Sequence, residues 1–169
     1  MKKLLIIIVL NIICIFPHAQ SLINYKTAIG KTFVNIKNIS VFKDYKEEMG
    51  TIISGLEKQN KGYHIISNGY NKKIILSKSI MQGNRVQYYE ILAILDIGNI
   101  KKNESIIVQE CRLNKKKDNL IIALINTINS QPYYTNIIKA WRLNPKNNTF
   151  NPIPTKGIDC INQEFYNMP

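Results

Sequence analysis

Residues 105–143 read SIIVQECRLNKKKDNLIIALINTINSQPYYTNIIKAWRL, and this stretch decides the fold. Successive side chains of residues 106–113 fall into two alternating sets, as on the two faces of a half-buried β-strand. One set is Ile106, Val108, Glu110 and Arg112, and the other is Ile107, Gln109, Cys111 and Leu113. Residues 120–127 are apolar at successive positions, which is typical of a strand buried on both faces. Residues 133–143 read as a further strand, and residues 144–148 supply a turn after it. The stretch therefore predicts the core of a small antiparallel β-sheet.

The segment that returns from this turn carries Pro152 and Pro154. Proline has no N–H to donate to a strand ladder. We therefore expect the returning segment to lie at a sheet edge, with both prolines facing water.

Strand and turn signals continue upstream of the core stretch. Residues 63–67 and 73–77 flank Asn68-Gly69, and an Asn-Gly pair is a strong hairpin signal because both residues tolerate positive φ. Residues 86–97 predict a long strand, and residues 32–36 predict a short first strand.

Residues 40–56 allow two interpretations. Apolar side chains recur there at helical spacing and Ser40 could cap a helix, but Gly50 and Gly55 weaken a helix. The other interpretation is a short helix or turn followed by a strand at 51–56. The predicted fold class is mainly β, an antiparallel sheet that is open, a sandwich or barrel-like, with a short N-terminal helix; α+β is the alternative.

The first twenty residues predict an export signal. Lys2 and Lys3 give a positive start, residues 4–16 are a nearly unbroken apolar run, and Ala19 offers a small residue for cleavage. We expect residues 1–19 to be a signal peptide and residues 20–169 to form a single globular domain. An uncleaved anchor is the alternative, but the run is shorter than a spanning helix of about 18 or more residues. No transmembrane segment is expected in the mature chain.

The chain is strongly basic, with 23 Lys and Arg against 11 Asp and Glu and a net charge of +12. Without the two lysines of the leader the net charge is +10. Such a surface favours encounter with anionic partners. The lysines are scattered, however, and only Lys115, Lys116 and Lys117 form a run. A nucleic-acid interface clusters its basic residues among exposed aromatic side chains, so specific nucleic-acid recognition is not expected.

Cys111 and Cys160 carry the strongest chemical signal. They are the two cysteines that remain after cleavage of the leader. An exported compartment permits oxidation, so the pair predicts a disulfide that ties the strand at Cys111 to the C-terminal tail. Two unpaired thiols are the alternative.

Signals for catalysis, metal binding and cofactor binding are weak. His64 is the histidine left after cleavage, and zinc usually draws several His or Cys ligands. A general base also needs a positioned partner, which the sequence does not identify for His64. No nucleophile elbow and no phosphate-binding glycine loop is present. The sequence thus points to no catalytic residue, no metal and no cofactor.

Trp141 and its neighbours suggest either a core or a binding surface. Trp, Tyr and Arg are enriched at binding hot spots. Large aromatic side chains are nevertheless mostly buried, so we expect Trp141 and Ile137 to face the core. Tyr134 and Arg142 would then cover an outer face, where they form a candidate binding surface together with Lys115, Lys116 and Lys117.

The ending of the chain resembles that of a group of small exported proteins of Gram-negative bacteria. The similarity rests on KAWR at 139–142, Phe150 and GIDCIN at 157–162. It covers about the last third of the chain and implies export and a shared fold in this region. It implies no activity and no functional residues.

These observations together predict a non-catalytic binding module that is periplasmic or secreted. Its partner would be a protein, a glycan or an anionic envelope component. An exported hydrolase and an envelope-associated structural protein are the alternatives. A pocket lined by converging polar groups would favour the enzyme, and a flat aromatic face would favour the binding module.

Overall fold

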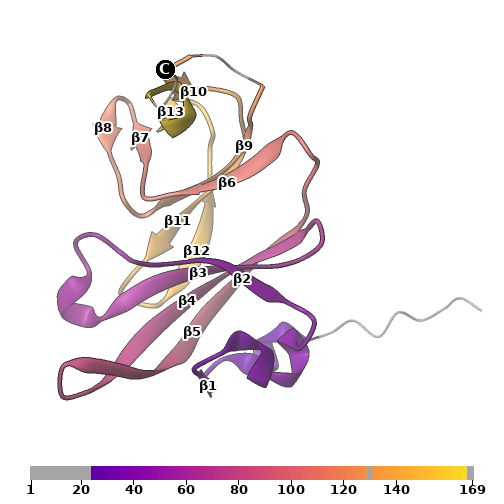
Figure 1. Cartoon of the computed structure of the whole chain (residues 1–169). Coiled ribbons are helices and arrows are strands. Elements are labelled where there is room, and N and C mark those ends of the chain that lie inside the picture. The colour runs from indigo at the N-terminus through magenta and orange to yellow at the C-terminus, as the bar shows by residue number, and fades with distance from the viewer. Residues whose placement is uncertain (1–23, 129–130, 167–169) are drawn as a thin grey trace, which may run out of the picture.

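The computed structural model describes residues 24–128 and 131–166. It contains three antiparallel sheets with few helical segments, which confirms the mainly β fold class (Figure 1). The sheets are open, since each has two terminal strands. The predicted signal peptide and the cleavage point after Ala19 lie outside the described residues.

The first sheet, here the N-terminal sheet, holds the predicted hairpins. Gly69 and Gly83 have positive φ in its two tight turns, and the residue after each glycine does not. This is the pattern of a type II′ turn, so Asn68 ends the strand instead of entering the turn. The strands, in spatial order, are β1 (Thr32–Phe33), β5 (Arg85–Asn99), β4 (Asn71–Gln82), β3 (Lys61–Asn68) and β2 (Lys46–Ile52).

The second sheet, here the middle sheet, confirms two expectations. β9 is an interior strand with both faces buried, and β12 is a terminal strand with Pro152 exposed. The strands, in spatial order, are β12 (Thr149–Ile153), β11 (Ile137–Asn144), β9 (Ile121–Asn126) and β6 (Glu104–Val108).

The third sheet, here the disulfide sheet, is small and consists of short strands. Its last strand leads into α1 (Gln163–Tyr166). The strands, in spatial order, are β10 (Tyr133–Tyr134), β13 (Ile158–Ile161), β7 (Cys111–Leu113) and β8 (Lys116–Lys117).

Two predicted strands are each divided between two sheets, so the prediction of continuous strands was wrong. The stretch 106–113 breaks at Gln109, which has φ +66°, and so β6 and β7 belong to different sheets. The stretch 133–143 breaks at 135–136, and β11 then shifts register between Ile137 and Lys139. Alternation along a strand holds only while the strand continues, so Ile137 packs toward the disulfide sheet and Trp141 toward the N-terminal sheet.

Residues 40–56 do not form the helix that their apolar spacing allowed. Short 3-10 turns η1 (Tyr25–Ala28), η2 (Ile36–Asn38) and η3 (Ser40–Phe42) precede β2, and η4 (Glu57–Gln59) follows it. The interpretation of a turn followed by a strand is closer, although the strand begins at Lys46 and ends at Ile52. A Cβ at Gly50 would lie 2.6 Å from the Glu47 carboxylate oxygen, so glycine leaves room inside the strand for the contact between Glu47 and His64.

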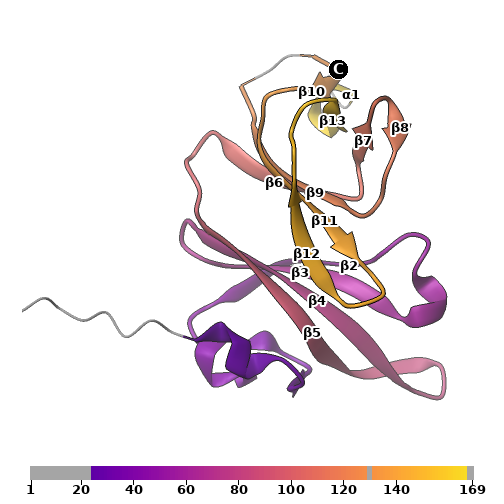
Figure 2. The same ribbon diagram turned by 180° about the vertical axis from the view of Figure 1, so that it is seen from behind.

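Three apolar clusters connect these layers. The first lies between the N-terminal and middle sheets, where Trp141 and Phe150 pack against it. The second lies under the N-terminal segment, on the opposite face of the N-terminal sheet. The third lies between the middle and disulfide sheets. The middle sheet is therefore covered on both faces, and Figure 2 shows it between the N-terminal sheet and the disulfide sheet.

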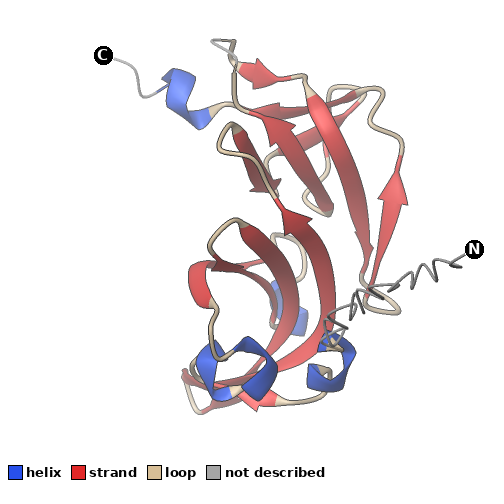
Figure 3. Ribbon diagram, turned by 90° about the vertical axis from the view of Figure 1, so that its right-hand side faces the viewer, coloured by secondary structure: helices blue, strands red, loops and turns tan. Residues whose placement is uncertain are grey.

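Short helical segments lie at both ends of the molecule (Figure 3). In the described ranges no helix is long and apolar enough to cross a membrane.

Candidate functional site

The predicted disulfide joins Cys111 of β7 to Cys160 of β13, and both residues are fully buried. They lie directly opposite each other in the antiparallel ladder. Their Cα atoms are 3.9 Å apart, closer than the usual range of about 4.4–6.8 Å. The tail around Cys160 forms β13, whose backbone groups are paired with β7 and β10.

An ion pair lies next to the disulfide on the same two strands. Arg112 donates from Nε and Nη2 to the two carboxylate oxygens of Asp159, at 2.6 and 2.9 Å. The guanidinium also covers the Tyr133 ring, 3.6 Å from its centroid. The bond to Asp159 raises the pKa of Arg112. These contacts hold β7, β10 and β13 together and leave the carboxylate of Asp159 already bound.

The candidate surface predicted from sequence is divided by the structure. Asn114 and Lys115 have φ +50° and +66° and form a tight turn, after which Lys116 and Lys117 form β8. All three lysines are exposed. Lys117 lies 3.6 Å from the Glu110 carboxylate.

Arg142 and Tyr134 lie in different surroundings. The Arg142 side chain is 53% exposed, and its Nε lies 2.9 Å from Asp118, which directly follows the lysine run. Tyr134 is only 5% exposed, so its placement on an outer face was wrong. It belongs to β10, whose inner face packs against the middle sheet.

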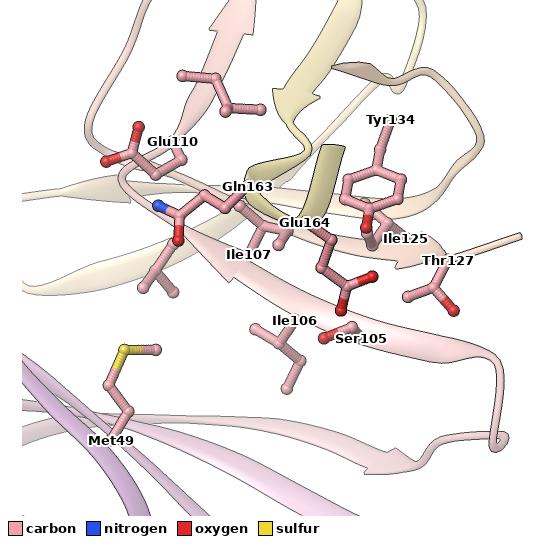
Figure 4. A pocket seen from close by; sticks show the side chains of 12 residues that line it. Met49, Ser105, Ile106, Ile107, Glu110, Ile125, Thr127, Tyr134, Gln163 and Glu164 are labelled. Carbon is pink, nitrogen blue, oxygen red and sulfur yellow. The ribbon is translucent and has the colours of Figure 1, made fainter. Parts of the chain in front are cut away.

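Tyr134 instead lines a pocket of about 280 Å³ where the three sheets meet (Figure 4). Most of the lining is apolar. In Figure 4 the Glu164 side chain reaches from α1 toward Ser105, and Met49 of β2 lies on the opposite side. The lining residues are Met49, Ser105, Ile106, Ile107, Val108, Glu110, Ile125, Thr127, Tyr134, Ile161, Gln163 and Glu164.

The charge of the pocket is opposite to that of the whole protein. Glu110 and Glu164 line it, and among the described residues no lysine or arginine does. Burial raises the pKa of Tyr134, and the nearby Glu164 carboxylate raises it further. The phenol therefore stays neutral at neutral pH, and a cation is the complementary charge for this site.

The pocket runs along the edge of β6. It is lined by Ser105, Ile106, Ile107 and Val108, and successive side chains of a strand point to opposite faces. A hollow that touches all four residues must lie beside the strand and not over one face. Because β6 is a terminal strand of the middle sheet, that side carries no further strand of the described chain.

Gln109, directly after β6, forms hydrogen bonds with the segment at the end of β2. Its Oε1 accepts from the Ser54 N–H at 2.7 Å, and its Nε2 donates to Thr51 Oγ1 and to the Ile52 carbonyl, at 3.1 and 3.0 Å. The residue is buried at the break between β6 and β7. It thereby fixes the position of β6 against the end of β2.

His64 has the partners that the sequence did not reveal. Its Nδ1 lies 2.8 Å from Glu47 Oε1, and its Nε2 lies 2.8 Å from Ser77 Oγ. A neutral imidazole that donates from Nδ1 to the carboxylate accepts from the serine hydroxyl at Nε2. Ser77, however, is 1% exposed. It lines neither the pocket along β6 nor the pocket that Glu47 and His64 line. Glu47 and Ser77 thus satisfy the hydrogen-bonding capacity of both ring nitrogens of the buried His64.

The residues missed by the sequence are distant along the chain. The register of β3 with β2 and β4 brings His64 to Glu47 and Ser77. The pairing of β7 with β13 brings Glu110 and Glu164 to the same pocket. The uncharged run 105–109 directly before Glu110 was the available signal for the pocket. Within the described residues, no group of three or more His, Cys, Asp or Glu side chains is placed to hold a metal ion.

Comparisons with known proteins yield no family: no family model matches the chain, and searches of curated proteins and of solved structures find no significant similarity.

Proposed function

We propose that the protein is an exported binding module and that its binding site is the pocket along β6. The observation that carries this proposal is the combination of an apolar lining with two carboxylates at an uncovered strand edge. Apolar lining supplies affinity, and a few placed polar groups fix orientation. Among the described residues, the lining contains no histidine that could serve as a general base, so binding is favoured over catalysis.

Three features support export. The leader has the composition of a signal peptide, and the ending resembles that of small exported proteins. The Cys111–Cys160 bridge is a disulfide, and disulfides persist in oxidising compartments. We place the mature protein in the periplasm or outside the cell, where its partner is a protein, a glycan or an envelope component.

A variant that fills the pocket tests this function. Ser105 is a small lining residue, and Ser105→Trp fills the hollow without removing a core side chain. Ser40→Trp, at an exposed position in η3, is the matched control. The mature protein is incubated with envelope extract and analysed by native mass spectrometry. A bound species that is retained by the control and lost in Ser105→Trp supports the site; equal retention by both variants contradicts it.

A second candidate function is hydrolysis, and the Glu47–His64–Ser77 array is the observation that favours it. We rank it second because Ser77 is too deeply buried to meet a substrate. A fluorophosphonate probe labels an activated serine. No labelling is expected, and labelling that disappears in Ser77→Ala would make the hydrolase the better function.

A further inference from the structure

We infer that the pocket along β6 takes an extended peptide that adds a strand to the middle sheet and places cationic side chains against Glu110 and Glu164. This inference rests on the proposed function. It names the class of partner for the same site.

The first argument is the lack of edge protection on β6. Exposed strand edges normally carry charges, prolines or bulges, or are very short, because a bare edge invites pairing with another chain. β2 carries Lys46, Glu47 and Glu48 and a register shift, and β12 carries Pro152. β8 consists of two lysines, and β1 and β10 have two residues each.

β6 differs from all of these. β6 carries one charge, at its first residue Glu104; residues 105–108 read Ser-Ile-Ile-Val, without a charge or a proline, and the ladder with β9 has no bulge. Of the six terminal strands in the described chain, β6 is thus the one longer than two residues that has neither a proline nor a register shift. A five-residue strand offers an edge of roughly 17 Å, enough to align a short peptide. An added strand gains main-chain hydrogen bonds for affinity and side-chain pockets for specificity.

The second argument is charge. In an extended peptide alternate side chains point to opposite sides. Apolar side chains on one side can enter the apolar lining while cationic side chains on the other reach the carboxylates. The net charge of +12 repels a cationic peptide at long range, so attraction must come from the local carboxylates. Lys117 lies 3.6 Å from Glu110 and competes for it.

The third argument is size. The volume of about 280 Å³ lies just below the range of about 300–1,000 Å³ for sites that enclose a drug-sized ligand. A hollow of this size beside a strand edge accommodates the side chains of a short segment whose backbone lies outside it.

The experiment uses defined peptides and the disulfide-bonded mature protein. The probe is a fluorescein-labelled hexapeptide, Lys-Val-Lys-Val-Lys-Val, with acetylated and amidated ends. Matched peptides replace lysine by serine or glutamate, or carry N-methyl groups on alternate backbone nitrogens. Binding is measured by fluorescence anisotropy.

The lysine peptide should bind at least about tenfold more tightly than the serine peptide, which corresponds to about 1.4 kcal/mol. The N-methylated peptide should lose binding, because it cannot complete the ladder. Glu110→Gln combined with Glu164→Gln should remove the preference for lysine. Ser105→Trp should abolish binding, and Lys117→Gln should strengthen it.

Four results would overturn the inference. Equal binding of the N-methylated peptide excludes strand addition, and equal binding of the glutamate peptide excludes recognition by the carboxylates. Equally tight binding of butylamine, measured by competition, shows a site for a small cation only. If no peptide binds but an envelope component is still lost in Ser105→Trp, the peptide inference fails and the proposed function stands. If no peptide binds and Ser105→Trp retains every bound envelope component, both the peptide inference and the proposed function are rejected.

Discussion

Removing the disulfide gives the largest expected loss of stability. Cys111 and Cys160 are separated by 49 positions, and closing a loop of this length stabilises the folded state by about 4 kcal/mol in the chain-entropy model. For a domain of this size that corresponds to a decrease in melting temperature of roughly 8–16 °C. The double variant Cys111→Ala with Cys160→Ala tests this value, because alanine avoids leaving a buried thiol or hydroxyl unpaired. Thermal unfolding is followed by circular dichroism.

The wild-type protein reduced under denaturing conditions and then refolded is the control for the alanine substitutions. Both samples should lose similar stability. Both should also show faster proteolysis after β13, because Ile161, Gln163 and Glu164 follow the bridge directly. The reasoning is refuted if the double variant unfolds within about 1 kcal/mol of wild type, or if the exported protein titrates two free thiols after denaturation.

Four further predictions concern the lysine run, the Glu48–Lys72 ion pair, the buried Gln109 side chain and export. Replacing the lysines at 115–117 by glutamine should weaken binding to anionic vesicles in a flotation assay, and salt should weaken wild-type binding by screening; binding that persists at high salt contradicts this. Burial opposes ionisation of Glu48, but the Lys72 ammonium at 2.6 Å, together with Ser67 and Lys46, outweighs it and lowers the pKa of the carboxyl below 4.5. The stabilisation is therefore present above pH 4.5 and is lost as the pH falls through the lower folded value, so Glu48→Gln should flatten the acid side of the stability profile; an unchanged profile argues against the pair. Gln109→Ala should cost about 1–3 kcal/mol in denaturant unfolding, because the buried Gln109 side chain makes three hydrogen bonds that alanine cannot make, and a neutral effect would contradict this role. Mass spectrometry of the exported protein should find a chain that begins directly after Ala19, and a retained leader would contradict cleavage.

Local patterns predicted those parts of the fold that depend on local physics. Gly69 marked its turn because few other residues adopt positive φ easily. Pro152 placed β12 at an edge because it cannot donate to a ladder. The apolar run at β9 indicated burial on both faces, and the structure provides a layer on each side.

The candidate site was less predictable because its members come from separate elements. Tyr134 was expected outside, since counting alternate residues from Trp141 assumed one continuous strand. The break at 135–136 and the register shift near Ile138 invalidate that count. Glu110 and Glu164 are 54 positions apart in the printed sequence, and no local periodicity relates them.

The sequence alone determined the mainly β class, the turn positions, the cysteine pair and the basic charge, because each follows from the chemistry of neighbouring residues or from composition. The tertiary structure decided how the strands divide into three sheets and which edge remains uncovered. A left-handed φ at Gln109 redirects the chain between two sheets, and its side chain then bonds to residues more than fifty positions away. Such a position is selected by the sum of distant contacts, which no local pattern of residues encodes.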